Sequence, residues 1–269
     1  MTVLALGLAP GAHAQDVLLQ IRPHVGDTVH MRLDQESELT RIHARADAPR
    51  PASVITDLSM FSRAIVRGTS RADATVLAIT DSVAMSTTDP QGRAVADATR
   101  RMLVGRQVML RIADDGTVTM LRANVPSGER MADVVALMPA ALPATAVRVG
   151  DHWTREMPLP SEHPFHGHAA GHLDAVFRLD SLSRDGAMAY ISVRGTLHSN
   201  SAATPVAGSF VQDGTVTGTM RLDRRRGWLA DTRFVIVVRS TMSPPAGSGR
   251  APMQFRIAIT QRTRTCDRR

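Results

Sequence analysis

The stretch at residues 142–153 reads Leu-Pro-Ala-Thr-Ala-Val-Arg-Val-Gly-Asp-His-Trp and lies near the middle of the chain. Its Val-Gly-Asp core also occurs near the start, where residues 23–29 read Pro-His-Val-Gly-Asp-Thr-Val. Each copy is followed by a run in which apolar and polar residues alternate, as in a half-buried strand. The repeat predicts two similar β-rich halves, 22–125 and 146–265, each opened by the same kind of turn.

Within each copy, a glycine and an aspartate form the turn that begins the strand. The pairs are Gly26-Asp27 and Gly150-Asp151. Aspartate at a turn commonly accepts hydrogen bonds from nearby backbone N–H groups, so capping is the predicted role of both carboxylates rather than catalysis. Trp153 starts the second strand and is expected to pack under the sheet.

Alternation with a period of two dominates the chain and predicts a mostly all-β fold. Clear examples are Thr28–Asp34, Trp228–Met242 and the run from Met253 to Ile259. One apolar and one polar face per strand indicate antiparallel sheets buried on one side. We predict a large curved antiparallel sheet, or half-barrel, built from the two halves; a barrel and a sandwich fit the same pattern.

Two short helices interrupt this pattern. Residues 93–102 are rich in alanine, and residues 127–138 place apolar side chains at helical spacing before Pro139. The second helix joins the halves, and it either covers one side of the sheet or only connects them. Between the helices, residues 107–121 predict a hairpin with a turn at Asp114-Asp115-Gly116.

Composition excludes some classes of function. All 32 basic residues are arginine and the formal net charge is +7, but only 3% of residues are aromatic. The arginines alternate with aspartates along predicted strands, and few aromatic side chains exist to stack on bases. We therefore expect solvated sheet faces and no nucleic-acid partner. No apolar run approaches 18 residues, so no transmembrane segment is expected.

The first residues resemble a signal peptide. An apolar run ends in Ala12-His13-Ala14, which predicts export with cleavage after Ala14 to the periplasm or the medium. The residue directly after this site is not a cysteine, so a lipid anchor is not expected. Cys266 is the only cysteine, which leaves no internal disulfide, and residues 266–269 are expected to form a frayed tail.

The central motif resembles a family of exported bacterial proteins that has no assigned activity. Its members carry Leu-Pro followed by Val-x-Val-Gly-Asp-x-Trp, here Leu142-Pro143 and Val147–Trp153, and a later hairpin similar to Met220–Leu229. The shape that this resemblance implies is similar to periplasmic lipoprotein carriers: a strongly bent antiparallel sheet with a helix or two across its concave side.

Four histidines within ten residues offer metal-binding chemistry. They are His163, His166, His168 and His172. Neutral imidazoles bind zinc, copper or nickel, although this spacing matches no established zinc motif. The cluster predicts either a divalent-metal loop or a solvent-exposed polar loop; no other cofactor is expected.

No local motif indicates an enzyme. The chain has no Gly-x-Ser-x-Gly, no phosphate-binding loop with lysine and no His-Glu-x-x-His. Three functions stay open, and the first is a non-enzymatic module that binds a hydrophobic small molecule, a lipid or a partner segment on its concave face. The others are a structural scaffold that contacts envelope components, and a hydrolase with residues assembled from distant positions. A binding module predicts an enclosed apolar pocket of at least about 300 Å³.

Overall fold

A computed structural model describes residues 16–42, 53–123, 142–159, 171–199, 210–242 and 252–266. These residues form eleven strands and one helix. None of the helical structure among them is long and apolar enough to cross a membrane. Residues 1–14 and 127–138, predicted to be a signal peptide and a helix, lie outside the described residues.

The elements match the predicted alternation closely. The first part of the chain forms β1 (Thr28–Ile42), β2 (Ser53–Thr69), β3 (Asp73–Thr87), α1 (Arg93–Leu103), β4 (Gln107–Ala113) and β5 (Val118–Ala123). The second part forms β6 (His152–Leu159), β7 (Gly171–Leu182), β8 (Met188–Ser199), β9 (Phe210–Asp223), β10 (Trp228–Met242) and β11 (Met253–Cys266).

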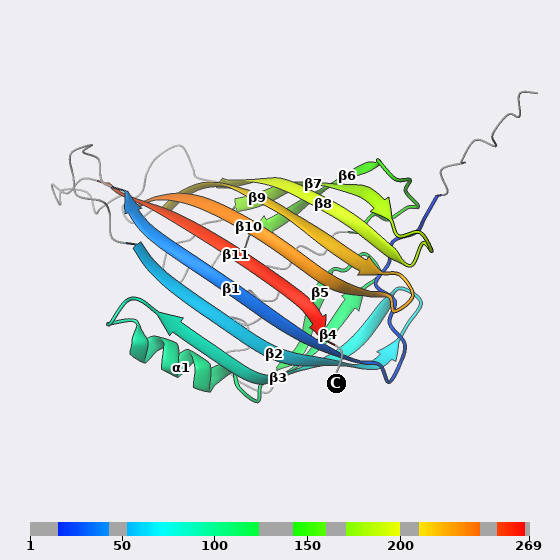
Figure 1. The fold of residues 1–269 in the computed structure, drawn as a ribbon, viewed down its shortest axis with the longest axis horizontal. Coiled ribbons are helices and arrows are strands. Elements are labelled where there is room, and N and C mark those ends of the chain that lie inside the picture. Colours follow the sequence, from blue (N-terminus) through cyan, green and yellow to red (C-terminus); the bar gives the residue numbers. More distant parts are fainter. Residues whose placement is uncertain are drawn as a thin grey trace, which may run out of the picture.

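All strands belong to one antiparallel sheet, which confirms the predicted fold class. The order is β5-β4-β3-β2-β1-β11-β10-β9-β8-β7-β6, so β1 and β11 meet in the middle. The sheet is not closed, because β5 and β6 form its two edges and no ladder joins them within the described ranges. In Figure 1 both edges curve behind the central strands, giving a half-barrel.

The hydrophobic core lies on the concave side. One cluster joins inward side chains of strands from both ends of the order, among them Val66, Val76, Leu110, Phe177 and Ile191. Side chains of β3 and β7 can share one cluster only if the sheet bends toward itself, because six strands separate them in the order. The face that carries these residues is called the inner face below.

Glycines allow the tight curvature of the second part. A Cβ placed at Gly218 in β9 would lie 2.3 Å from the Arg233 carbonyl oxygen and 2.5 Å from the Phe234 ring. At Gly214 it would lie 2.5 Å from the Val237 carbonyl oxygen. The backbones of β9 and β10 therefore approach more closely than any side chain at these two positions would permit.

The segment before β1 closes one end of the concave side. Val17 forms an isolated antiparallel bridge with Val147. The Ile21 N–H donates to the Asp114 carbonyl at 2.8 Å, and the Arg22 N–H donates to the Gly227 carbonyl at 2.9 Å. The segment thus connects two distant turns and buries Leu19 completely. This end is called the closed end.

Two local predictions are confirmed, and the first residue of the predicted tail lies within a strand. The helix at 93–102 is α1, and the hairpin at 107–121 is β4–β5 with Gly116 at a φ of 86°. Cys266, however, belongs to β11, is paired with His30 and is half-buried. Its Sγ lies 4.0 Å from the Arg264 carbonyl oxygen, so the strand includes the residue at which fraying was expected to begin.

Candidate binding surfaces

The two Gly-Asp turns have the same structure. The N–H of His24 donates to Asp27 Oδ2 at 2.9 Å, and the N–H of Arg148 donates to Asp151 Oδ2 at 2.8 Å. Gly26 and Gly150 both adopt a positive φ, 91° and 97°, which glycine tolerates without steric cost. Each aspartate thus accepts a backbone hydrogen bond within its own turn, the contact expected of a turn-capping carboxylate.

Each turn precedes one strand and forms the same pair of backbone hydrogen bonds with the next strand along the chain. Gly26 N–H donates to the Val66 carbonyl and Val66 N–H donates to the Asp27 carbonyl, at 3.0 and 2.9 Å. In the second turn Leu179 takes the place of Val66, with distances of 2.7 and 3.1 Å. The turns therefore begin equivalent hairpins, β1–β2 at the centre of the sheet and β6–β7 at its edge.

Trp153 follows the second turn and lies on the inner face. Its ring stacks on Phe177 with 5.8 Å between centroids and 10° between planes, and its side chain is half-buried. Trp228 is buried in the core. Both tryptophans pack against other side chains, and for Trp153 this was expected from the sequence.

An apolar belt crosses the inner face of four central strands, away from the closed end. Register places Leu39 opposite Val54 on one side and Ile257 on the other, and Ile257 opposite Val238. All members of the belt are only half-buried, in contrast to the core residues near the closed end. The apolar belt comprises Leu39, Val54, Ile236, Val238, Ile257 and Ile259.

A polar band lies between this belt and the closed end. Gln35 is opposite Gln261, and Thr263 is opposite Thr232. The hydroxyl oxygens of Thr232 and Thr263 are buried and have no hydrogen-bond partner among the described residues. The inner face of β10 and β11 thus offers apolar side chains and uncharged polar ones.

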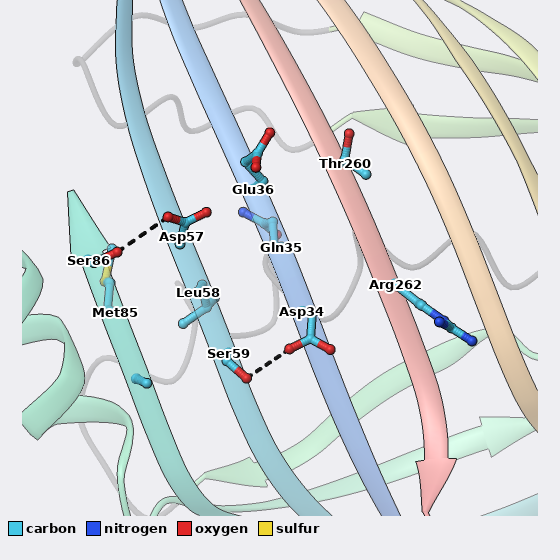
Figure 2. A pocket seen from close by; sticks show the side chains of 11 residues that line it. Asp34, Gln35, Glu36, Asp57, Leu58, Ser59, Met85, Ser86, Thr260 and Arg262 are labelled. Carbon is cyan, nitrogen blue, oxygen red and sulfur yellow. Dashed lines mark hydrogen bonds between the residues drawn. The ribbon is translucent and has the colours of Figure 1, made fainter. Parts of the chain in front are cut away.

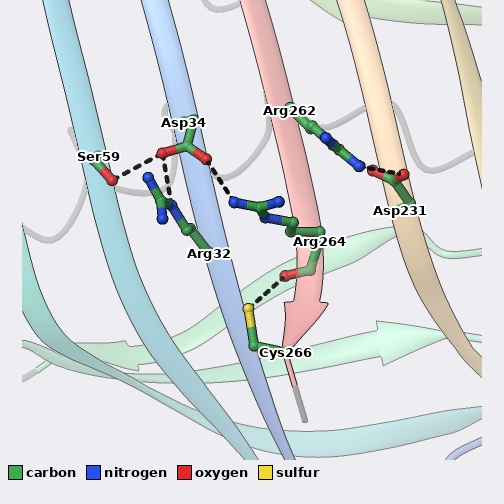
Figure 3. Close-up of polar contacts among 7 residues, drawn as sticks. All are labelled: Arg32, Asp34, Ser59, Asp231, Arg262, Arg264 and Cys266. Atoms are coloured by element: carbon green, nitrogen blue, oxygen red, sulfur yellow. Dashed lines mark hydrogen bonds and ion pairs between the residues drawn. The ribbon is translucent and has the colours of Figure 1, made fainter.

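The outer face instead carries a ladder of arginines and carboxylates (Figure 3). Asp34 accepts hydrogen bonds from Arg32 Nε and Ser59 Oγ, each at 2.8 Å, and lies 3.7 Å from Arg264. Burial raises the pKa of Asp34, but the hydrogen bonds and the charges of Arg32 and Arg264 lower it by more, so the net pKa is below the usual value.

A second set of charged contacts on the outer face is the pair Arg262–Asp231. The guanidinium donates two hydrogen bonds of 3.0 Å to the carboxylate, which raises the pKa of Arg262. Arg221 also approaches Asp231, at 4.0 Å. Around Asp34 and Asp231 the arginines are therefore paired with carboxylates, whereas the register also places Arg233 opposite Arg262 and Arg239 opposite Arg256.

Two of the hollows among the described residues are open to solvent rather than enclosed and apolar. One, of about 450 Å³, crosses the central strands; Asp57 accepts a hydrogen bond from Ser86 there, and Asp34 accepts one from Ser59 (Figure 2). The other, of about 580 Å³, lies along residues 143–147 and 150–155 beside the second turn. Both are open to solvent and lined by many polar groups.

The histidine cluster is described only at its last member, because His163, His166 and His168 lie outside the described residues. His172 begins the outer face of β7 and is directly opposite His198 of β8. Sequence reasoning missed His198, because only the β7–β8 register brings it beside His172. No three His, Cys, Asp or Glu side chains in the described ranges already surround a point suited to a metal ion.

Comparison with known proteins assigns no family to this chain. No protein-family model matches the chain, and no curated protein matches it significantly.

Proposed function

We propose that this is an exported, non-enzymatic protein that holds an apolar ligand on the concave side of its sheet. The observation that supports the proposal most directly is the apolar belt. Six branched aliphatic side chains on adjacent strands stay half-exposed, whereas Val66 of β2 and Phe234 of β10, nearer the closed end, are buried. A contiguous exposed apolar surface of this kind is typical of an interaction site.

The dimensions of the belt limit what it can hold. It crosses β2, β1, β11 and β10, and three gaps of about 4.8 Å between strands give a width of about 14 Å. That width fits an extended acyl chain or one face of a helix, whose diameter is about 10–12 Å. An open belt of this type replaces the enclosed pocket expected from the sequence, so the ligand would lie along a surface and keep one side accessible.

Charge also favours the inner face over the outer face as the binding surface. The inner side chains of β10 and β11 are uncharged, so a ligand there would not leave a buried charge unpaired. On the outer face, arginines such as Arg32, Arg256 and Arg262 lie beside carboxylates. Arg194, Arg233 and Arg239 on the same face are exposed and carry no ion pair with a described residue, so a scaffold for anionic envelope polymers stays the second candidate.

Two adjacent residues of β10 provide the test. Ile236 belongs to the apolar belt, and Val235 is 44% exposed on the outer face. We expect the apolar dye N-phenyl-1-naphthylamine to fluoresce with the wild-type protein and to bind Ile236→Asp at least about 10-fold more weakly, because the carboxylate would be desolvated. Val235→Asp should bind as the wild type does.

Circular dichroism melting of both variants separates loss of the surface from loss of the fold. Native mass spectrometry of the protein purified from its producing cells would then identify a co-purified lipid. Equal dye binding by both folded variants, or no dye binding by the wild type, would rule out the inner face as the binding surface.

A further inference from the structure

Three titratable side chains converge on the outer face where β7 and β8 pair. His172 and His198 are directly opposite each other, and their ring centroids are 5.2 Å apart with an angle of 31° between planes. Asp174 follows His172 by two residues and therefore lies on the same face. Its Oδ2 is 3.5 Å from His172 Nε2 and 3.6 Å from His198 Nε2.

These separations are longer than good hydrogen bonds, whose N···O distances are about 2.7–3.2 Å. One carboxylate oxygen thus lies almost equally far from two imidazole nitrogens. In a tetrahedral zinc site with ligand distances of about 2.1 Å, neighbouring ligand atoms are about 3.4 Å apart. The two distances from Asp174 Oδ2 to the imidazole nitrogens therefore match two edges of such a tetrahedron within about 0.2 Å.

The third edge, between the two imidazole nitrogens, must adjust, since in their present arrangement the described side chains include no group of three that could hold a metal ion. The exposed fractions allow this adjustment: the side chain of His198 is 49% exposed and that of Asp174 is 55% exposed. Rotation of the His198 ring needs no change in the backbone, which the β7–β8 ladder holds in place. Solvent access also leaves the fourth position open to water.

Neighbouring carboxylates favour a cation at this corner. Register places Glu156 of β6 opposite Asp174, and Asp213 of β9 opposite His198. Both are exposed and share the outer face with the two histidines. With Asp174, the local surface therefore carries three carboxylates beside two imidazoles, and this arrangement lowers the electrostatic cost of a divalent ion.

We propose that His172, His198 and Asp174 form a site for a divalent first-row transition metal ion. Two imidazoles and one carboxylate suit zinc, copper and nickel better than magnesium or calcium, which prefer oxygen ligands. The site differs from the histidine loop predicted from the sequence, because it requires His198 and does not require His163, His166 or His168. It is also independent of the apolar belt, which lies on the opposite face.

Isothermal titration calorimetry of the full chain with Zn²⁺ and Cu²⁺, in a buffer without chelators, tests the site. We expect one ion per chain and a decrease in affinity of at least about 10-fold for His198→Ala, for His172→Ala and for Asp174→Asn. The matched control is His152→Ala, an exposed histidine on the outer face of the adjacent strand β6. That variant should bind as the wild type does.

The triple variant His163→Ala/His166→Ala/His168→Ala separates the two metal hypotheses. Less than about a 3-fold change, with loss of binding in His198→Ala, would support the β7–β8 site. Loss of binding in the triple variant would assign the ion to the loop and overturn the proposal. Wild-type affinity in folded His198→Ala, or no heat with the wild type, would overturn it as well.

Discussion

Arg155 Nη2 lies 3.6 Å from Asp115 Oδ2, which connects the two edges of the open sheet at its closed end. Arg155 belongs to edge strand β6, whereas Asp115 lies in the turn that precedes the other edge strand, β5. The same guanidinium donates to the Leu142 carbonyl at 2.7 Å, and the Leu142 N–H donates to the Asp115 carbonyl at 2.8 Å. Arg155, Asp115 and Leu142 thus connect the edge strands β5 and β6, which do not pair with each other in the described ranges.

Loss of this connection should destabilise the protein and loosen the closed end first. We expect Arg155→Ala to lower the free energy of unfolding by about 1–3 kcal/mol, because it removes one hydrogen bond made by a charged group and one ion pair. Urea unfolding measures the decrease, and hydrogen exchange of the Leu142 and Val147 amides locates it. Arg194→Ala, an exposed change on the outer face of β8, is the control. Unchanged exchange at both amides would contradict the connection.

A second prediction concerns the close approach of β9 to β10. Gly218→Ala should lower the free energy of unfolding by about 1–3 kcal/mol, since its Cβ would meet the Arg233 carbonyl and the Phe234 ring. Gly68→Ala is a matched control, because a Cβ there has nothing within 4 Å. Its effect should stay within about 0.5 kcal/mol, as for most surface substitutions. Equal thermal denaturation midpoints for the two variants would show that β9 can move away from β10.

The two Gly-Asp turns give a third prediction. Asp27→Ala and Asp151→Ala each remove one side-chain acceptor from an equivalent turn. Each should cost about 1 kcal/mol of unfolding free energy in urea, comparable with the loss of a helix N-cap. The double variant should show the sum, since the sites share no contact. An unchanged unfolding free energy in either single variant would show that the two turns, despite their equivalent geometry, do not contribute equally to stability.

Acid sensitivity is the fourth prediction. The pKa of Asp34 is below its usual value of 3.8 in the folded protein. Such a group stabilises the fold above its unfolded pKa, and this contribution disappears as the pH falls through the folded pKa. Between about pH 4 and pH 2, wild-type unfolding free energy should therefore decrease more steeply than that of Asp34→Asn. Chemical denaturation across this range makes the comparison, and parallel profiles would contradict it.

The sequence predicted the strands well because each has one buried and one solvated face. β10 spans Trp228–Met242 as expected, and Phe234, Ile236 and Val238 share the inner face. Local alternation cannot state which strands pair, so the contact of β1 with β11 was not foreseen. For the same reason His198 escaped notice, since its relation to His172 depends on register and not on spacing along the chain.

The meeting of β1 and β11 also determines when the fold can be completed. Each strand from β1 to β10 has a pairing partner among its immediate neighbours in the chain, but β11 must enter between β10 and β1. During synthesis the two meanders therefore present unpaired edges until residues 253–266 leave the ribosome. Protection of those edges by a chaperone, or rapid translation of the last strand, would therefore increase the yield of correctly assembled protein.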